Sequence, residues 1–320
     1  MGALVLSRSE VERVLAEAGP AALLDALAAG FEALSAGRLT APPRSGIAIG
    51  EEGQLFTMPG HVPGLDTGVK LVGIYPGNAA RGLPTHQAVV CLFDAGTGVC
   101  RAVLDGTAIT EARTAGAAAL SARLLARPGA RVLAVVGTGA QAEAHLRALP
   151  EVRDFAEVRL AGRDAGRVAA LAGAHPGVVA ADGVEAAVHG ADVVCLCTSS
   201  SEPVLDPGWL APGAHVTSVG FAPPDGELPR ALAARGRLFV ESRRAFEPPP
   251  AGCAELQGLD PDAAAELGEV LLGRREGRTG EDQVTVYKSM GHVAEDLAAA
   301  ALVADRARAA GAGREVDLLG

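Results

Sequence analysis

A short glycine motif carries the clearest chemical signal in this sequence. Gly137, Gly139 and Ala142 follow the apolar run 131–136 and open a stretch with helical spacing. Such a turn lets a pyrophosphate approach the backbone, and the helix behind it presents free N–H groups and the positive end of its dipole to the phosphates. We therefore expect this turn to bind a dinucleotide.

The residues that follow the next apolar run indicate which dinucleotide is bound. Arg163 and Asp164 stand directly after the strand-like run 157–161, where the adenine ribose is usually recognised. An arginine there suits a 2′-phosphate and favours NADP(H), whereas a carboxylate at Asp164 would suit the ribose hydroxyl of NAD(H). A plain surface turn is the third interpretation. Thr198, after the run 192–197, is equally compatible with a cofactor contact and with a turn.

Three cations stand apart from this region, and one of them has an unusual setting. Arg44 follows two prolines, Arg113 lies in an Ala-rich stretch, and Lys70 is flanked by apolar residues at 69 and 71–72. A lysine that points inward from such a strand needs an anionic partner, because burying an unpaired charge is costly. From the local pattern alone, an edge-strand lysine facing water is the favoured alternative.

Two patterns of secondary structure divide the chain near residue 128. Before it, helical spacing in 9–34 gives way to short strand-like runs and then to an Ala-rich helix over 110–125. The runs are 45–49, 54–58, 68–75, 87–94 and 101–105. After residue 128, short apolar strands alternate with helices up to residue 241, which is typical of a parallel sheet. Helix is predicted again over 264–272 and 283–308.

The predicted fold class is therefore α/β, with two domains. A Rossmann-type doubly wound parallel sheet occupies 116–289, and an α+β domain occupies 1–115 and is completed by the C-terminal helix within 290–320. A chain of 320 residues is long enough for two cores.

Composition argues against several kinds of partner. The net charge is −10 and no run of Lys or Arg is present, so nucleic acid and membrane surfaces are poor candidates. No apolar stretch is long enough to cross a bilayer and no signal peptide precedes the first helix, so we expect a cytoplasmic protein. Five cysteines and seven histidines lack the spacing of a metal site, and Cys195 and Cys197 are expected to be small buried residues.

Ordered motifs along nearly the whole chain resemble the ornithine cyclodeaminase/mu-crystallin family. They are 68–72, 75–78, 81–86, 111–115, 137–142, 288–291 and 295–296. The resemblance implies a homodimer formed through the first domain, which also binds a small amino or imino acid. It further implies a nicotinamide cofactor, NADP(H) by preference and NAD(H) as the alternative.

The same resemblance assigns roles to individual residues. The substrate carboxylate would be held by Arg44, Lys70 and Arg113, and Met290 would lie beside the substrate. Lys70 is the candidate for polarising or protonating the imine, which would require a lowered pKa. Contacts to the dinucleotide would come from Thr85, Arg113, Gly137, Gly139, Ala140, Gln141, Arg163, Thr198 and Ser289.

One loop departs from the cyclodeaminase pattern. Cyclodeaminases carry an Asp after the fifth strand as their general base, and aligning on Gly220 places Ala222 there. Asp225 is the candidate replacement, although a turn residue after Pro224 is an equally good interpretation. We therefore expect an NAD(P)H-dependent imine reductase or amino-acid dehydrogenase. The alternatives are a redox-neutral cyclodeaminase that releases ammonia, and a mu-crystallin-like protein that binds NADPH and a ligand without turnover.

Overall fold

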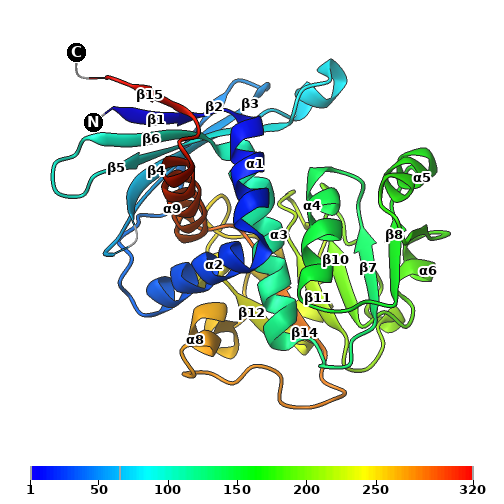
Figure 1. Cartoon of the computed structure of the whole chain (residues 1–320). Coiled ribbons are helices and arrows are strands. Elements are labelled where there is room, and N and C mark those ends of the chain that lie inside the picture. The colour runs from blue at the N-terminus through cyan, green and yellow to red at the C-terminus, as the bar shows by residue number, and fades with distance from the viewer. Residues whose placement is uncertain (1, 65, 319–320) are drawn as a thin grey trace. The chain divides into compact units, whose positions relative to one another are not determined.

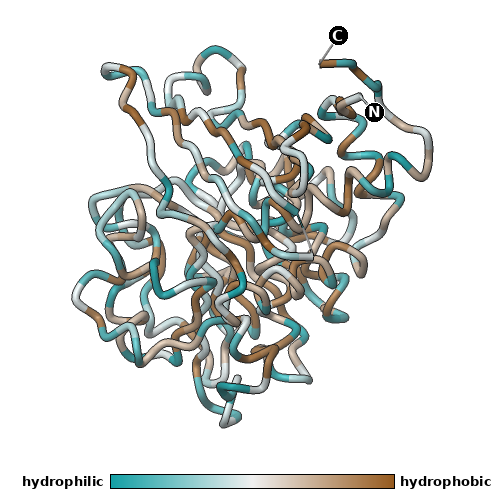
Figure 2. The backbone as a smooth tube through the Cα atoms, turned by 90° about the vertical axis from the view of Figure 1, so that its left-hand side faces the viewer, coloured by the Kyte–Doolittle hydropathy of each residue, from teal (hydrophilic) through white to brown (hydrophobic). Residues whose placement is uncertain are grey.

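The computed structural model describes residues 2–64 and 66–318, which form two compact units (Figure 1). Unit 1 consists of Met1–Arg113 and His292–Gly320, and unit 2 consists of Thr114–Gly291. The sequence placed the two boundaries at 115/116 and 289/290. In each unit the hydrophobic residues lie mostly in the strands and helices of the interior (Figure 2).

Unit 1 is built on a seven-stranded mixed sheet with the order β15-β1-β6-β5-β4-β3-β2. Its strands are β1 (Ala3–Leu6), β2 (Ser45–Ile49), β3 (Gly53–Val62), β4 (Asp66–Ile74), β5 (His86–Phe93), β6 (Cys100–Asp105) and β15 (Arg314–Val316). Neighbouring strands are antiparallel except β1 and β6, which are parallel. The helices are α1 (Arg8–Ala18), α2 (Pro20–Ser35), α3 (Gly106–Leu125), which begins in this unit, and α9 (Val293–Ala310).

Helix α9 lies against one face of this sheet, and two glycines bring it close (Figure 1). Gly60 of β3 and Gly68 of β4 are register partners. A Cβ at Gly60 would lie 2.9 Å from a methyl of Val293, and one at Gly68 would lie 2.8 Å from a methyl of Leu297. The paired glycines thus form a depression that seats the first turns of α9.

The opposite face of the same sheet carries a group of exposed apolar side chains. They belong to β2, β3, β4 and β5, and their register and alternation place them on one face. The group, here called the outer apolar face, consists of Ile47, Ile49, Leu55, Leu71 and Val89, each between 37% and 61% exposed. Grouped exposed apolar side chains are typical of surfaces that bind a partner.

Unit 2 contains an eight-stranded sheet in which every registered pair is parallel. Its order is β13-β12-β14-β11-β10-β7-β8-β9. The strands are β7 (Val132–Val136), β8 (Glu157–Ala161), β9 (Val178–Ala180), β10 (Val193–Leu196), β11 (His215–Ser218), β12 (Arg237–Val240), β13 (Ala265–Glu266) and β14 (Thr285–Lys288). The chain order reverses between β7 and β10, and in such sheets ligands bind at the carboxyl ends of the strands beside this point.

Short helices join these strands and cover the sheet. They are α4 (Ala140–Ala148), α5 (Ala165–Ala174), α6 (Val184–Val188), α7 (Arg230–Arg235) and α8 (Leu267–Leu271). The doubly wound α/β class expected from the sequence is confirmed.

The C-terminal part of the predicted secondary structure needs correction. Residues 283–308 were predicted as helix, but 285–288 form strand β14, and α9 starts only at Val293. A four-residue apolar run has no periodicity that separates strand from helix, and its pairing with β11 and β12 decides the outcome. Helix α9 starts late because Gly291 adopts a φ of 74° and His292 caps the helix. Strands β1, β13 and β15 were not predicted, and β13 lies inside the stretch 264–272 that was predicted as helix.

Cys195 and Cys197 are buried and free, as expected of small core residues, and burial raises the pKa of both thiols. Within the described ranges, no three His, Cys, Asp or Glu side chains are grouped as a metal site would need. No single described helix is long and apolar enough to cross a membrane, although α1 and α2, which meet at 97°, would meet that criterion as a bent pair.

Candidate active site

Lys70 is the most buried cation of unit 1 and points toward α9. It lies in the middle of β4 between its register partners Met58 and Val90, both buried, and is itself 3% exposed. The water-facing alternative for this lysine is therefore wrong, because β4 is an interior strand covered by a helix. Its Nζ donates to Oδ1 of Asp296 at 3.0 Å.

Arg113 reaches the same carboxylate oxygen from α3. Its Nε donates to Oδ1 of Asp296 at 3.0 Å, and its Nη1 donates to Oε2 of Glu295 at 3.1 Å. Both carboxylates are fully buried. Two of the three cations predicted from the sequence thus converge on one oxygen atom. We call Lys70, Arg113, Glu295 and Asp296 the charge cluster.

The two carboxylates of the charge cluster have different structural roles. Glu295 accepts the backbone N–H of His292 at 2.8 Å and so completes the capping box of α9. Asp296 accepts only from Lys70 and Arg113, and no described group donates to its buried Oδ2. Both acids belong to the first turn of α9, where the helix dipole favours negative charge.

The cluster shifts the pKa values of its members in directions that follow from burial and pairing. Burial lowers the pKa of Lys70 to about 8, although Asp296 opposes the shift and Arg113 adds to it. Burial works to raise the pKa of Asp296, but the charges of Lys70 and Arg113 outweigh it and lower that pKa. The pKa of Glu295 is raised, chiefly by burial. Lys70 is thus a cation that can release its proton near neutral pH.

Arg44 lies in line with Lys70 on the sheet. It is half-buried and precedes Ser45, whose register partner is Thr57. Extending that register by one residue places Arg44 across from Met58, the partner of Lys70. His86 of β5 lies farther along the same face, and its pKa is lowered by burial and then by the charge of Lys70.

The glycine turn of unit 2 has the geometry that a dinucleotide requires. It joins β7 to α4 at the carboxyl edge of the sheet, directly beside the reversal of strand order. Gly137 adopts a φ of 133°, and a Cβ there would collide with the carbonyl oxygen of Cys197 after β10. Ala142 is fully buried against the sheet, so the small residue is needed for packing.

Gly139 has the opposite environment to Gly137. A Cβ added there would meet nothing within 4 Å, although the residue is the N-cap of α4 and no side chain caps that helix. Ala140 is exposed and Gln141 half-buried at the first positions of the helix. This open space before a helix N-terminus fits a pyrophosphate group.

The residues after β8 that bear on the choice of cofactor lie in different environments. Arg163 is exposed, whereas Asp164 caps α5 by accepting the backbone N–H of Arg167 at 3.0 Å. Arg167 in turn donates to the carbonyl oxygen of Thr138 in the glycine turn at 3.1 Å. One oxygen of Asp164 is therefore used in capping α5, and a second arginine contacts the glycine turn. The sequence interpretation missed Arg167, which lies in the first turn of α5, close behind the end of β8.

Thr198 occupies the predicted place after β10, but its backbone N–H and its hydroxyl already donate hydrogen bonds within the protein. Its backbone N–H and hydroxyl each donate to Oε2 of Glu227 at 2.7 Å. The other oxygen of Glu227 accepts from the Ser218 hydroxyl and from the backbone N–H groups of Val219 and Gly220. Glu227 is a buried residue that sequence reasoning missed, and it ties together the ends of β10 and β11.

Lys288 adds a cation to this second network. Its Nζ donates to Ser218 Oγ at 3.2 Å, to the Gly220 carbonyl at 2.6 Å and to Glu255 Oε1 at 2.9 Å. It is fully buried, and burial is outweighed by Glu255, which together with further groups raises its pKa. Lys288 therefore serves as a structural cation beneath the loop that begins at Gly220.

That loop contains the two positions at which the chain departs from cyclodeaminases. Ala222 is half-buried, and Asp225 is exposed on a turn whose backbone N–H donates to the carbonyl of Ser201. This is the setting of a turn residue, so the geometry adds no support to Asp225 as a catalytic base. Its role stays a prediction.

The remaining predicted site residues lie in both units. Ser289 is buried directly after β14, and its N–H donates to the Ser218 carbonyl. Met290 packs partly against the core of unit 2. Thr85, half-buried before β5 in unit 1, has its hydroxyl 3.1 Å from Nδ1 of His86. The contacts predicted for these three residues remain untested.

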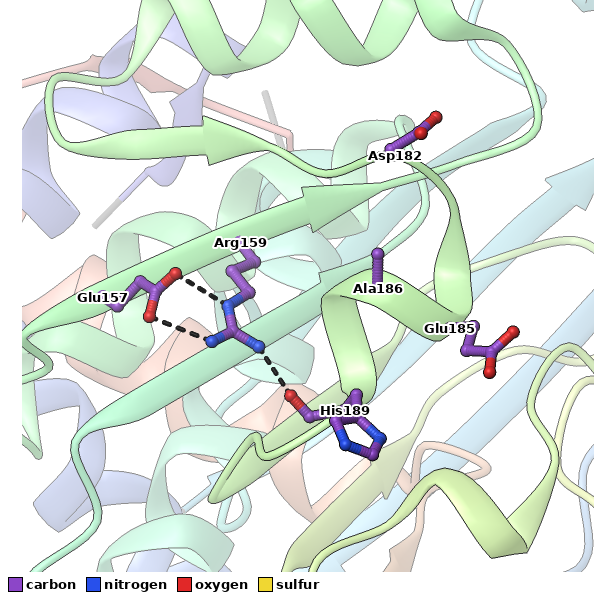
Figure 3. Close-up of a pocket in the computed structure, with 6 residues that line it drawn as sticks. All are labelled: Glu157, Arg159, Asp182, Glu185, Ala186 and His189. Carbon is purple, nitrogen blue, oxygen red and sulfur yellow. Dashed lines mark hydrogen bonds and ion pairs between the residues drawn. The ribbon is translucent and has the colours of Figure 1, made fainter.

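A shallow hollow of about 630 Å³ lies elsewhere in unit 2 (Figure 3). It is lined by Glu157, Arg159, Asp182, Glu185, Ala186 and His189. Arg159 is fully engaged, with Glu157 and with two backbone carbonyls of the α6 region. The hollow lies at the beginning of β8, away from the carboxyl edge, and we assign it no role in the chemistry.

The contrast between the two glycines gives a paired prediction. Gly139→Ala should leave the melting temperature nearly unchanged, because its Cβ enters open space, but it should weaken NADPH binding at least about tenfold by obstructing the phosphates. Gly137→Ala should destabilise unit 2 by about 1–3 kcal/mol, because a left-handed φ is lost and a carbonyl is struck. Thermal denaturation and fluorescence titration with NADPH measure both. Equal NADPH affinity for Gly139→Ala and the unaltered protein would contradict this assignment of the phosphate position.

Comparison with known proteins agrees with this arrangement. A ketimine reductase mu-crystallin from Mus musculus is 38% identical over 286 residues, which cover 88% of this chain and 90% of the mouse protein. The Δ1-pyrroline-2-carboxylate reductase of Thermococcus litoralis, solved in complex with NADH and L-proline, is 27% identical with a TM-score of 0.90, covering 98% of this chain and all of its own. An archaeal alanine dehydrogenase dimer with bound NAD is 28% identical with a TM-score of 0.88 over the full length of both chains.

The family indicated by the sequence motifs is confirmed at the level of the whole chain. Residues 3–311 match the model of that family, which leaves only short stretches at either end unmatched. The charge cluster and the glycine turn both lie inside the matched range. On this evidence the chain belongs to the ornithine cyclodeaminase/mu-crystallin family.

Proposed function

We propose that this protein is an NADPH-dependent reductase of a small cyclic α-imino acid, which it converts to the α-amino acid by hydride transfer to the α-carbon. It is an NAD(P)-dependent oxidoreductase of the imine reductase and amino-acid dehydrogenase type, as its relatives are named reductases and dehydrogenases. The observation that carries the proposal is the convergence of Lys70 and Arg113 in a buried cluster of a chain that also has a dinucleotide turn.

The charge cluster offers what an α-imino acid needs at its acid end. Arg113 carries a planar guanidinium that can bind a carboxylate with two parallel hydrogen bonds. Lys70 adds a point charge, and Arg44 lies in the same row of the sheet. Such a clamp fixes the α-carbon of the substrate, which removes rotational freedom before the chemical step.

Lys70 is the group that can supply the proton. With a pKa of about 8 it is mostly protonated at neutral pH, yet it gives up its proton far more readily than an ordinary lysine. Transfer of that proton to the imine nitrogen leaves Lys70 neutral and makes the C=N carbon a better hydride acceptor. The nicotinamide supplies the hydride when it is bound. As the hydride forms the new C–H bond, the π electron pair of the C=N bond moves to nitrogen, and the product is the amine.

Two alternatives differ in what they require of the loop after β11. A redox-neutral cyclodeaminase needs a base for the substrate amine, and this chain has Ala222 at the expected position and an exposed Asp225 nearby. A binding protein without turnover needs no proton donor, so a lysine with a pKa near neutrality would have no purpose. Ornithine converted to proline and ammonia without net cofactor turnover would support the first alternative. Tight NADPH binding with no activity on an imino-acid panel would support the second.

NADP(H) is the cofactor we propose, in preference to NAD(H). Arg163 is exposed after β8 and Arg167 stands beside the glycine turn, so two guanidinium groups are available to a 2′-phosphate. Asp164, the residue that would favour NAD(H), is occupied in capping α5. NAD(H) remains the alternative cofactor.

A homodimer formed through the outer apolar face is the proposed assembly. The face spans four neighbouring strands of unit 1, and in water it would leave five large apolar side chains exposed. An archaeal relative of similar structure is a dimer. A second copy of the same face would cover these side chains symmetrically.

The role of Lys70 can be tested by its pH dependence. With Δ1-pyrroline-2-carboxylate and NADPH, kcat/KM should fall on the alkaline side with an apparent pKa of about 8, since the protonated lysine is the active form. Lys70→Met should lower kcat/KM by at least about 10²-fold. Absorbance at 340 nm follows the reaction.

Lys70→Arg is the matched control for that experiment. It keeps the positive charge for the substrate carboxylate and for Asp296, but an arginine does not release its proton at these pH values. We expect KM to stay within a few-fold and kcat to fall by about 10²-fold or more. Retention of kcat in Lys70→Arg would rule out Lys70 as the proton donor.

Cofactor preference can be tested at Arg163. Arg163→Ser should raise the KM for NADPH by about 10- to 100-fold, the equivalent of a lost charge-assisted hydrogen bond, and leave the KM for NADH unchanged. Arg147→Ser, which alters an exposed arginine in the last turn of α4, is the matched control. An equal loss for both cofactors would show that Arg163 does not read the 2′-phosphate.

The assembly can be tested on the outer apolar face. Leu71→Glu should convert the dimer to monomers, because a charge in the middle of β4 cannot be buried against its copy. Val179→Glu changes an exposed apolar residue of β9 in unit 2 and should leave the dimer intact. Size-exclusion chromatography with light scattering gives the masses. A Leu71→Glu dimer would place the interface elsewhere.

A further inference from the structure

We propose that Asp296 is the positioning residue for Lys70, and that the sharing of its Oδ1 with Arg113 acts together with burial to leave Lys70 able to release a proton. The inference rests on the proposed function only for the use made of that proton. It concerns a contact inside unit 1, between β4, α3 and the first turn of α9.

Both hydrogen bonds that the Asp296 carboxylate accepts come from the two cations of the charge cluster. Its Oδ1 accepts from Lys70 Nζ and from Arg113 Nε, both at 3.0 Å, and no described group donates to Oδ2. Its neighbour Glu295 completes the helix cap, so the cap does not require Asp296. A buried carboxylate with an unsatisfied oxygen is costly, and the two cations are the only described groups that donate hydrogen bonds to it.

The second lysine of the protein provides an internal comparison. Lys70 and Lys288 are the only lysines in the sequence. Both are buried and both bind a buried carboxylate at about 3 Å. Their pKa values nevertheless shift in opposite directions, downward for Lys70 and upward for Lys288.

The difference between the lysines follows from their partners. Lys288 has three acceptors, and neither oxygen of Glu255 receives a hydrogen bond from another described cation. Lys70 has one acceptor, and the guanidinium of Arg113 uses the same oxygen. Arg113 thus weakens the hold of Asp296 on the Lys70 proton and also repels the ammonium group. A lysine held in this way stays charged at neutral pH but is not locked in that state.

Other charged groups also lie near Lys70 and interact with its ammonium charge. Glu295 on α9 adds a weaker attraction, and His86 on β5 is close enough for the charge of Lys70 to lower its pKa. Arg44 lies in line with Lys70 at the start of β2. The direct register partners, Met58 and Val90, are apolar. Asp296 is therefore the one anion in hydrogen-bonding contact with Lys70 among the described residues.

The presence of only two lysines allows a direct measurement. In protein labelled with ¹⁵N-lysine, the side-chain amines give two signals, and Lys70→Arg identifies the one from Lys70. We expect that signal to titrate near pH 8 in the unaltered protein. Asp296→Asn should lower its titration midpoint by about 1–3 pH units, the usual effect of one adjacent opposite charge. Glu295→Gln, the matched control, should shift it by less and keeps the acceptor for the His292 N–H.

A second variant covers the case in which Asp296→Asn does not fold. Arg113→Gln removes the competing cation and should move the Lys70 midpoint upward. Shifts in opposite directions for the two variants support the proposal. An unchanged midpoint in either variant, or an equal downward shift in Glu295→Gln and Asp296→Asn, overturns it.

The titration needs no substrate, so it separates this inference from the proposed function. The pH profile of kcat/KM for Asp296→Asn provides the link between them, and its alkaline limb should move down with the Lys70 midpoint. If the midpoint moves and the limb does not follow, the positioning role of Asp296 stands, and the assignment of Lys70 as proton donor fails.

Discussion

One carboxylate oxygen, buried in unit 1 and shared by a lysine and an arginine, is the constraint on which the chemistry of this protein depends. Asp296 is fully buried, as is the carboxylate beside it, and both cations are nearly so. Four charges taken out of water are tolerated only with close pairing, because an unpaired member would cost several kcal/mol. The sheet, the Ala-rich helix α3 and the first turn of α9 must therefore all hold their places for the cluster to exist.

Unit 2 contains a second buried network with a different task. Glu227 accepts five hydrogen bonds at the ends of β10 and β11, and Lys288 donates three in the same region. All the polar groups named there have partners, which makes such a network rigid. It orders the carboxyl edge of the sheet, where the glycine turn also lies. The charge cluster of unit 1, in contrast, leaves one oxygen of Asp296 without a described donor. We assign the chemistry of the protein to this cluster.

More of the structure of unit 2 than of unit 1 could be predicted from the sequence, because unit 2 depends on a repeated local pattern and the site of unit 1 depends on contacts between distant residues. Alternating strands and helices and the spacing of Gly137 and Gly139 define a local structure, so the Rossmann-type sheet could be expected. The inward direction of the Lys70 side chain could not be predicted in this way, because the residues of β4 show the same pattern whether or not a helix covers the strand. Asp296 lies 226 residues from Lys70. Only the family motifs connected the two regions, and they suggested neither the shared oxygen nor the buried role of Glu227. Strand β14 was predicted as helix because its pairing partners, not its own four residues, decide its conformation.

The paired glycines of β3 and β4 have a consequence for how this protein can change over time. Gly60 and Gly68 touch no reacting group. A Cβ at Gly60 would nevertheless press on Val293, and one at Gly68 would press on the Cys91 carbonyl of β5 and on Leu297, so either would disturb the seat of α9. Helix α9 carries Asp296, so a displacement of its first turns would change the contact between this carboxylate and Lys70. Natural selection acting on turnover would thus remove variants at two sites that carry no reacting group, and an engineer who replaces these glycines to make the sheet more rigid would disturb the charge cluster instead.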